Sequence, residues 1–288
     1  MVGVAVRSIV LTVYSIAVAA LLIAAPAGSG KPVAARTLLA VGDIASCEVT
    51  ADEAVADLVA RTPGTVALLG DTVYENGTAD EFQRCFLPRW GRFLPRTRAA
   101  LGNHEYANGA SDAEAAKSVL RLPADGWYSY RLGAWHIVVL DSNCEAVGGC
   151  ERDSPQWRWL RNDLARSRAM RCVLAYWHQP RFSSGEHGSD VRYAPFWDLL
   201  AAARADLVLS GHDHDYERFG PLKGIRSFVV GTGGRSQHDF GAVRPNSLVR
   251  QSGAYGVLRL TLRPSGYSWA FLRASGKPFS DTGSGRCR

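Results

Sequence analysis

The 288 residues contain no internal repeat, no low-complexity tract and no long linker, which is typical of a single globular unit. The chain also lacks a tract of lysine and arginine interleaved with aromatic side chains, so nothing in it supports nucleic-acid binding. The formal net charge of +6 could steer anionic substrates, but a genome that favours arginine explains it equally well, and we favour that explanation. The apolar content of 47% suits one α/β domain with a large core.

One apolar run stands apart near the N-terminus. Arg7 precedes this run at residues 9–25, which ends in Ala25-Pro26-Ala27. The order predicts a secretory signal peptide at residues 1–27 and a mature, secreted protein that starts near Gly28, without stable membrane association. Because the run is about as long as a minimal membrane span, an uncleaved membrane anchor is the alternative. No cysteine follows closely enough for lipid attachment.

Five short polar clusters each follow an apolar run, and each run predicts a buried strand. In chain order the clusters are Gly42-Asp43, Gly70-Asp71-Thr72-Val73-Tyr74, Gly102-Asn103-His104-Glu105, Tyr176-Trp177-His178 and Gly211-His212-Asp213-His214. Ligands at the carboxyl ends of neighbouring strands converge on one edge of a sheet, where open α/β sheets place their sites. The strands are predicted at residues 37–41, 66–69, 97–101, 172–177 and 207–209.

Together the clusters supply two carboxylates, one phenol, one amide and three imidazoles, which is the donor set of a two-metal hydrolase. The hard oxygen donors among them suit a trivalent ion. Dinuclear sites of this kind mostly hydrolyse phosphate esters. No serine, cysteine or histidine nucleophile with a partner base lies at these strand ends, so we expect direct transfer of the phosphoryl group to water.

The order of the motifs resembles the metallophosphoesterase superfamily, whose general pattern is D-x-H, G-D-x-x-D, G-N-H-[DE], H and G-H-x-H. Ala45 stands where the histidine of D-x-H would be, and Tyr74 where the last aspartate of G-D-x-x-D would be. This paired exchange resembles the purple acid phosphatase branch, in which the tyrosine ligand binds iron(III). The match extends from about Leu38 to Tyr216. It suggests a small secreted bacterial-type form, because the first motif comes too early for the N-terminal β domain of plant-type members.

The resemblance implies a calcineurin-like metallophosphoesterase fold, an α/β four-layer αββα sandwich of two mixed β-sheets flanked by helices, over a catalytic domain at residues 36–288. The sequence pattern agrees, because amphipathic helical stretches fall between the predicted strands. The last part of the chain predicts a strand-rich second half-sheet at residues 225–230, 255–262 and 267–272. The helices are predicted at residues 52–61, 112–121, 155–166 and 194–203.

The same resemblance implies that seven side chains hold two metal ions and that a metal-bound hydroxide attacks phosphorus in line. His104 follows a ligand and cannot easily bind the same metal, so it is predicted to protonate the leaving alkoxide or to grip the phosphate; the alternative is a histidine that only supports the loop. His187, in a polar loop soon after His178, is predicted to contact substrate, with an ordinary loop residue as the alternative. The implied ligands are Asp43, Tyr74 and His214 for the first metal, Asn103, His178 and His212 for the second, and Asp71 as the catalytic bridge between them.

Charge counting supports a trivalent first metal independently of the resemblance. Asp43, Asp71 and a Tyr74 phenolate carry three negative charges, so two divalent ions and one hydroxide would leave the site neutral. A trivalent–divalent pair restores a net positive charge, which attracts an incoming phosphate. We therefore expect iron(III) beside Tyr74 and a second, divalent ion that is iron, zinc or manganese.

Other polar residues have weaker support. His136 lies in an apolar stretch and is predicted to be a satisfied sheet histidine, and His238 is predicted to be an ordinary loop residue. Asp213 and Asp215 either orient the imidazoles beside them or are solvated turn carboxylates.

Six cysteines, an even number, agree with an oxidising compartment, and none lies at a metal-motif position, so disulfides are expected rather than metal ligation. Cys144 and Cys150 bracket a short loop and form the first predicted pair. Cys47–Cys85 and Cys172–Cys287 follow, as one choice among fifteen connectivities.

These observations predict a secreted dinuclear-metal phosphatase that hydrolyses phosphate monoesters of small phosphorylated substrates. A phosphodiesterase or nucleotide pyrophosphohydrolase would use the same metals with a different pocket. A non-catalytic secreted binding protein is a further alternative on the fold alone, although complete ligand sets are rarely kept without metals.

Overall fold

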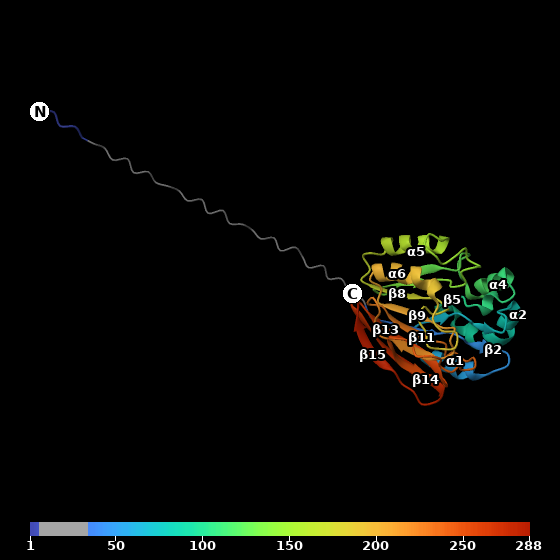
Figure 1. Ribbon diagram of the computed structural model, residues 1–288. Coiled ribbons are helices and arrows are strands. Elements are labelled where there is room, and N and C mark those ends of the chain that lie inside the picture. The colour runs from blue at the N-terminus through green and yellow to red at the C-terminus, as the bar shows by residue number, and fades with distance from the viewer. Residues whose placement is uncertain (6–33) are drawn as a thin grey trace. The chain divides into compact units, whose positions relative to one another are not determined.

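Two β-sheets packed face to face form the centre of the protein in this computed structural model, which describes residues 1–5 and 34–288 (Figure 1). The predicted signal peptide falls mainly on residues 6–33, outside the described residues. Residues from Val33 onward belong to one compact unit, and this unit contains every predicted site residue.

The first sheet has six strands. In spatial order they are β15 (Thr282–Arg286), β14 (Gly266–Gly276), β13 (Ala254–Arg263), β1 (Arg36–Val41), β3 (Thr65–Leu69) and β5 (Thr97–Ala100). β1, β3 and β5 are parallel, whereas β13 pairs antiparallel with β1 and sets Leu260 opposite Leu38. The parallel strands are apolar on both faces, because one face meets the second sheet and the other meets helices.

The second sheet has seven strands. In spatial order they are β12 (Ser247–Gln251), β10 (Tyr216–Phe219), β11 (Arg226–Val230), β9 (Leu207–Ser210), β8 (Cys172–Tyr176), β7 (Trp135–Val139) and β6 (Tyr128–Leu132). β11, β9, β8 and β7 are parallel, and β6, β10 and β12 are antiparallel to their neighbours. Two short strands, β2 (Ala45–Ser46) and β4 (Val73–Tyr74), pair separately beside the motifs.

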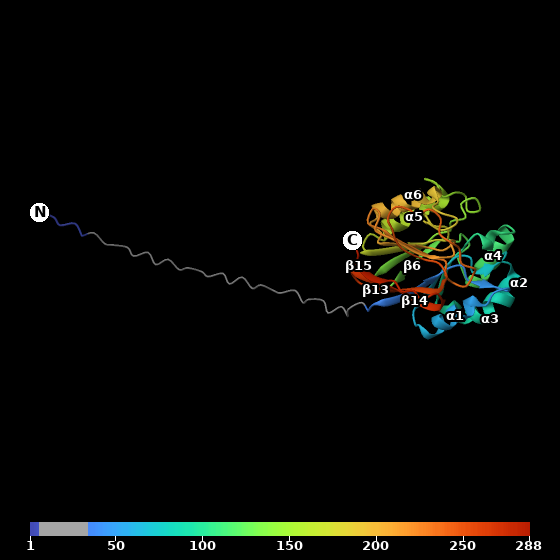
Figure 2. The same cartoon turned by 60° about the horizontal axis from the view of Figure 1, so that its bottom comes forward.

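Helices cover the outer face of each sheet, so the layers run helix, sheet, sheet, helix and the predicted αββα sandwich is confirmed. Figure 2 shows α5 and α6 on one side of the sheets and α1 and α3 on the other. α5 begins where its sequence favours a start, because the Ser154 hydroxyl accepts the N–H of Trp157 at 3.3 Å and Pro155 is the first helical residue. The helices are α1 (Ala51–Arg61), α2 (Ala79–Glu81), α3 (Leu87–Trp90), α4 (Ala110–Leu120), α5 (Pro155–Arg166) and α6 (Ala194–Ala202), with short turns η1 (Phe82–Phe86), η2 (Gly91–Arg96), η3 (His104–Tyr106) and η4 (Val191–Tyr193).

The C-terminal part differs from the predicted second half-sheet. β11 does join the second sheet, but β13 and β14 complete the first sheet beside β1. Apolar periodicity predicts that a segment is a strand, but it does not specify which strand becomes the partner. The sequence also left the helical segment at residues 79–96 unpredicted.

The three disulfides are the predicted pairs Cys47–Cys85, Cys144–Cys150 and Cys172–Cys287. All six cysteines lie in the described part of the chain, and none of them is free. Over residues 1–5 and 34–288, no helix has the length and apolar character needed to cross a membrane.

Candidate metal centre

The predicted motifs meet at one end of the sandwich, where strands of both sheets finish. Asp43, Asp71 and Asn103 follow strands of the first sheet, whereas His178 and His212 follow strands of the second. A backbone hydrogen bond of 2.9 Å from Gly42 N–H to the Val230 carbonyl joins the two sheets at this point. The predicted convergence on the edge of a single sheet is therefore corrected, because two sheets with their carboxyl ends side by side supply the donors.

Tight backbone geometry places these donors. Asp43, Asp71 and His212 have left-handed φ values of 61°, 47° and 71°. This conformation costs such residues about 1 kcal/mol or more, and it persists where the surrounding structure enforces it. The neighbouring glycines allow close approach, since a Cβ on Gly102 would lie 2.1 Å from Asp71 Oδ1 and one on Gly211 would lie 2.5 Å from Asp43 Oδ2. Because glycines stand at these turns, no side chain separates the donors that follow the strands.

The hydroxyl of Tyr74 lies at the middle of a first group of donors. Its oxygen is 3.0 Å from Asp43 Oδ1, 3.1 Å from Asp71 Oδ2 and 3.1 Å from His214 Nε2. Ligands bound to one ion at 2.0–2.2 Å lie roughly 3.0 to 3.5 Å from one another. The spacing of these four donors therefore fits a single metal ion.

Asp71 also belongs to a second group. Its Oδ2 lies 3.1 Å from His178 Nε2, which in turn lies 3.1 Å from Asn103 Oδ1 and 3.2 Å from His212 Nδ1. The other oxygen, Oδ1, accepts the backbone N–H of His104 at 3.0 Å. One carboxylate oxygen thus faces both groups, which is the geometry of a bridging ligand.

Buried charge makes this cluster a site for cations, since Asp43, Asp71, Tyr74 and His178 are all buried. Burial opposes ionisation of Asp71, but the charge and hydrogen bond of His178 outweigh it and lower the pKa of the carboxyl below its usual range. Burial likewise disfavours a charged His178, yet Asp71 and Asp43 raise its pKa to about 10. Burial and the two carboxylates raise the pKa of Tyr74 well above its usual value. A metal ion bound here would balance the buried carboxylates, and His178 would then bind it as the neutral ring.

Backbone carbonyls orient two of the imidazoles. His178 Nδ1 donates to the Leu69 carbonyl at 2.8 Å, and His214 Nδ1 donates to the Ser236 carbonyl at 2.6 Å. Each bond fixes the ring and leaves the Nε2 lone pair directed at the donor group. The residues present therefore fit two metal ions.

Glu105 is a fully buried residue for which the sequence predicted no role. Its carboxylate accepts backbone N–H groups of Asp71 at 3.0 Å, Thr72 at 2.6 Å and Gly102 at 2.6 Å. Burial and the charge of Asp71 raise the pKa of Glu105 to about 7, while the backbone donors favour its ionised form. Glu105 therefore links the loops of the second and third motifs. Its position directly after His104, within the third motif, is the sequence feature that could have predicted this role.

A cavity of about 180 Å³ opens onto the donor groups. His104 Nδ1 donates to the Glu75 carbonyl, and His187 Nδ1 lies 3.1 Å from Asp213 Oδ1, so each ring keeps Nε2 available. Arg235, another residue with no predicted role, lies 5.0 Å from the ring centroid of Tyr74 and forms an ion pair with Glu75. The cavity is lined by Asp71, Tyr74, Glu75, Asn103, His104, His187, His212, His214, Arg235, Ser236 and His238.

The aspartates beside the last motif are not solvated. Asp213 and Asp215 are both fully buried, so the alternative of solvated turn carboxylates is wrong. Asp213 accepts the backbone N–H of His187 at 2.8 Å and the hydroxyl of Ser183. Asp213 therefore orients His187, which is not one of the predicted metal ligands.

The structure confirms the prediction for one further histidine and corrects the prediction for another. His136 is confirmed as a satisfied sheet histidine, because its Nε2 lies 2.6 Å from Asp163 Oδ2. His238 is more than the predicted loop residue, since its ring stacks on His214 with centroids 4.0 Å apart and lines the cavity.

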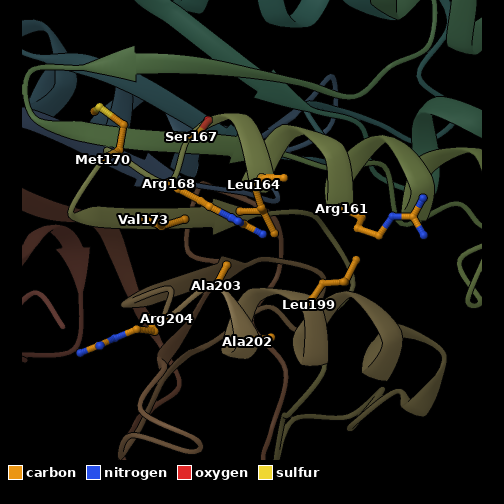
Figure 3. A pocket seen from close by; sticks show the side chains of 11 residues that line it. Arg161, Leu164, Ser167, Arg168, Met170, Val173, Leu199, Ala202, Ala203 and Arg204 are labelled. Atoms are coloured by element: carbon orange, nitrogen blue, oxygen red, sulfur yellow. The ribbon is translucent and has the colours of Figure 1, made fainter.

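A larger cavity of about 490 Å³ lies between α5 and α6, away from the motifs (Figure 3). Leu164 and Leu199 contribute to its apolar walls, and Figure 3 shows Arg161 and Arg204 pointing outward at its two ends. The described residues that line it include no carboxylate, imidazole or thiol. Size therefore does not identify the functional site, whereas the donor set does.

Residues 36–216 match the family model of the calcineurin-like phosphoesterases. The chain belongs to this family. The chain is 27% identical over 216 residues to purple acid phosphatase 15 of Arabidopsis thaliana, an alignment that covers 62% of this chain and 40% of that protein. It is 30% identical over 184 residues to phosphoenolpyruvate phosphatase of Allium cepa, which covers 54% of this chain and 36% of the relative. The resemblance to metallophosphoesterases with purple acid phosphatase relatives is confirmed, and the chain spans well under half the length of these two relatives.

Solved structures share the fold of this chain. Purple acid phosphatase PPD1 from yellow lupin superposes with a TM-score of 0.66 at 17% identity, covering 86% of this chain and 53% of that one. GAP50, the anchor in the inner membrane complex of Plasmodium, has a TM-score of 0.70 at 17% identity, covering 88% of this chain and 90% of that one. A dimetal phosphatase of Danio rerio has a TM-score of 0.55 at 16% identity, covering 87% of this chain and 98% of that one. These identities show the fold alone; family membership implies a dinuclear metal site, which the donor groups fit.

Proposed function

We propose that this protein is a secreted phosphatase that hydrolyses phosphate monoesters at a dinuclear centre, with iron(III) beside Tyr74 and a divalent iron, zinc or manganese ion in the second position. The observation that carries the proposal is the Tyr74 hydroxyl, 3.0 Å from Asp43 and 3.1 Å from both Asp71 and His214. A phenolate there adds a third negative charge to two buried carboxylates, which favours a trivalent ion.

The two donor groups support one set of ligands for each metal. Bound ions would supply Lewis acidity to the phosphate oxygens and an activated water molecule. Asp71 would hold both ions, because its Oδ2 lies 3.1 Å from Tyr74 and from His178, and its Oδ1 accepts the backbone N–H of His104. The proposed ligands are Asp43, Tyr74 and His214 for the first metal, Asn103, His178 and His212 for the second, and Asp71 for both.

His104 and His187 act on the substrate. Both rings are held at Nδ1, so Nε2 is the nitrogen that meets the phosphate ester. His104 Nε2 lies 3.8 Å from Asp71 Oδ2, close to the shared oxygen, and is placed to give a proton to the leaving alkoxide. His187 has its ring centroid 4.2 Å from that of His212 and grips the phosphate on the side of the second metal.

The size of the cavity favours monoesters. Its volume of about 180 Å³ lies below the 300–1,000 Å³ typical of small-molecule sites, so it encloses little more than the phosphoryl group. The alcohol part of a monoester would lie outside, whereas a diester must place two organic groups around one phosphorus. This arrangement supports a phosphatase over a phosphodiesterase.

The three disulfides support export. Such bonds persist in oxidising compartments and are rare in the cytosol. Mass spectrometry of secreted material should show a mature chain that starts near Gly28 and has no thiol that alkylates without reduction. An intact leader, or six alkylatable cysteines, would contradict secretion.

One experiment tests the activity: metal content and a visible spectrum of the purified protein, followed by a phosphate-ester panel across pH. We expect two metal ions with one iron among them, an absorption band from phenolate-to-iron charge transfer, and faster hydrolysis of p-nitrophenyl phosphate than of the bis-ester. Faster hydrolysis of the bis-ester would favour the phosphodiesterase or nucleotide pyrophosphohydrolase. A metal-free protein without activity on any ester would favour a non-catalytic binding protein.

A further inference from the structure

Three side chains beside the catalytic cavity form another group of donors outside the seven already assigned. His187, Asp213 and His238 each offer one ligand atom, and these atoms all lie within 4.8 Å of one another. The residues come from three different loops, which follow β8, β9 and β11. We propose that they form, together with Glu186, a rim site for a third metal ion of the zinc type, and that occupation of this site inhibits the enzyme. The inhibition rests on the proposed function, whereas the binding does not.

The distances suit such an ion. His187 Nδ1 lies 3.1 Å from Asp213 Oδ1, and His238 Nδ1 lies 3.5 Å from Glu186 Oε2. Ligands bound to one ion at 2.0–2.2 Å lie roughly 3.0 to 3.5 Å from one another, and both distances fall within this range. Two imidazoles with two carboxylates also form a donor set that zinc accepts readily.

An unsatisfied nitrogen marks the position. Nδ1 of His238 is buried and has no hydrogen-bond partner among the described residues, because its contact with Glu186 lacks the geometry of a hydrogen bond. The ring cannot easily turn away, since it stacks on His214 and its backbone N–H donates to the His214 carbonyl at 3.2 Å. A buried nitrogen without a partner is unfavourable, and a metal ion would satisfy it.

Charge balance allows this ion to sit near two others. Asp213 and Glu186 bring two negative charges, so a divalent ion leaves the rim site neutral and adds little repulsion toward the main centre. Oδ2 of Asp213 accepts the Ser183 hydroxyl and Oδ1 accepts the backbone N–H of His187 at 2.8 Å, and Oδ1 has a further lone pair for the metal. Glu186 is 65% exposed and is free to complete the coordination from the solvent side.

Occupation of the rim site would affect catalysis through the walls of the cavity. His187 and His238 both line the 180 Å³ cavity and belong to different loops. An ion bound to both ties these loops together and holds His187 by the nitrogen that otherwise bonds to Asp213. Substrate entry and product release would slow, so activity should fall as zinc rises beyond the amount that fills the main centre.

Zinc binding to the purified holoprotein, measured by equilibrium dialysis without substrate, tests the site. We expect a third zinc per chain, bound more weakly than the ions of the main centre. Glu186→Gln and His238→Gln should each weaken this third ion by at least about tenfold and retain the first two. Asp239→Asn is the matched control, because it removes the same charge from an exposed residue beside His238 that is not among the donors.

A wild-type protein that binds no third zinc, or Glu186→Gln and His238→Gln proteins that bind it as Asp239→Asn does, would overturn the rim site. Activity at rising zinc, taken for each variant relative to its own zinc-free rate, tests the inhibition. The zinc concentration that halves the activity should be the same for wild type and Asp239→Asn. For Glu186→Gln it should be at least about tenfold higher. A third zinc that binds without inhibiting would overturn the inhibitory role. A protein with no phosphatase activity would refute the proposed function, and dialysis would still decide the site.

Discussion

The hydroxyl of Tyr74 lies 3.1 Å from Oδ2 of Asp71, and the same oxygen of Asp71 lies 3.1 Å from Nε2 of His178. One carboxylate oxygen therefore joins the phenol of the first donor group to the imidazole of the second. A change at Tyr74 should act on the first position alone, whereas a change at Asp71 should act on both. This difference separates the roles of the two residues by experiment.

Tyr74→Phe should bleach the visible band and weaken selectivity for iron(III). The variant lacks the phenolate, so one negative charge is missing from the first donor group and divalent ions fit it better. The checks are the visible spectrum and metal analysis after loading with a mixture of iron and divalent ions. Tyr106→Phe is the control, because that hydroxyl donates to Asp141 rather than to the donor groups, and it should keep the band. A colourless, iron-free wild type that is fully active with two divalent metals would contradict the iron assignment.

Asp71→Asn should cost far more activity than His187→Ala. Loss of the carboxylate charge and of one of its two oxygens loosens both metals, which removes several kcal/mol of transition-state stabilisation, about 10³-fold or more in rate. His187→Ala removes one contact to a charged phosphate, worth about 1.5–3 kcal/mol or roughly 10- to 150-fold. Values of kcat/KM for p-nitrophenyl phosphate and the metal content of both variants make the comparison. Equal losses would mean that Asp71 does not bridge.

Glu105→Gln should destabilise the fold and the metal centre together. The amide nitrogen of glutamine cannot accept a hydrogen bond, so at least one of the three backbone N–H donors loses its buried partner, at a cost of about 1–3 kcal/mol. Urea unfolding and metal analysis provide the measurement. Glu114→Gln, at a position 65% exposed, should change the free energy of unfolding by no more than about 0.5 kcal/mol. A Glu105→Gln protein as stable as that control would refute the role of the carboxylate in tying the loops.

Asp52→Asn should stabilise the protein near neutral pH and have little effect in acid. Burial raises the pKa of Asp52 from 3.8 to about 6, although its carboxylate accepts the indole N–H of Trp90 at 3.1 Å. The folded state therefore holds a proton that the unfolded state has released, so the stability of the wild type falls as pH rises between about 4 and 6. Asparagine keeps an acceptor for Trp90 and has no charge to bury. Thermal unfolding at about pH 4 and about pH 7.5 should show the gain in Tm only at the higher pH.

The control for that measurement is Asp57→Asn, a change of the same charge at a position 63% exposed on the same helix. Its effect on Tm should be small at both pH values because surface ion pairs contribute little. An Asp52→Asn gain of the same size at both pH values would show that the effect is not the titration of the carboxyl.

The sequence by itself determined the main strands and helices around the centre, and it predicted seven donor side chains that the structure brings together. Each of the five motifs follows an apolar run, and four of them begin with a glycine. These are local signals, because strand formation and sharp turns depend on neighbouring residues. The disulfide pairs and the sheet role of His136 were also correct. The partners of β13 and β14 were not, since the pattern that makes a strand apolar is the same whichever sheet it enters.

Only the tertiary structure decided how residues distant in the chain meet. Glu105 acts on the loop of Asp71, Asp213 holds His187, and His238 lies against His214, each through contacts that periodicity does not encode. The centre also required two sheets rather than one, because β1 and β11 finish side by side and join through Gly42. A sequence motif specifies which atoms can bind a metal, whereas the packing of the sheets sets their spacing, their charge balance and the partners that hold them in place.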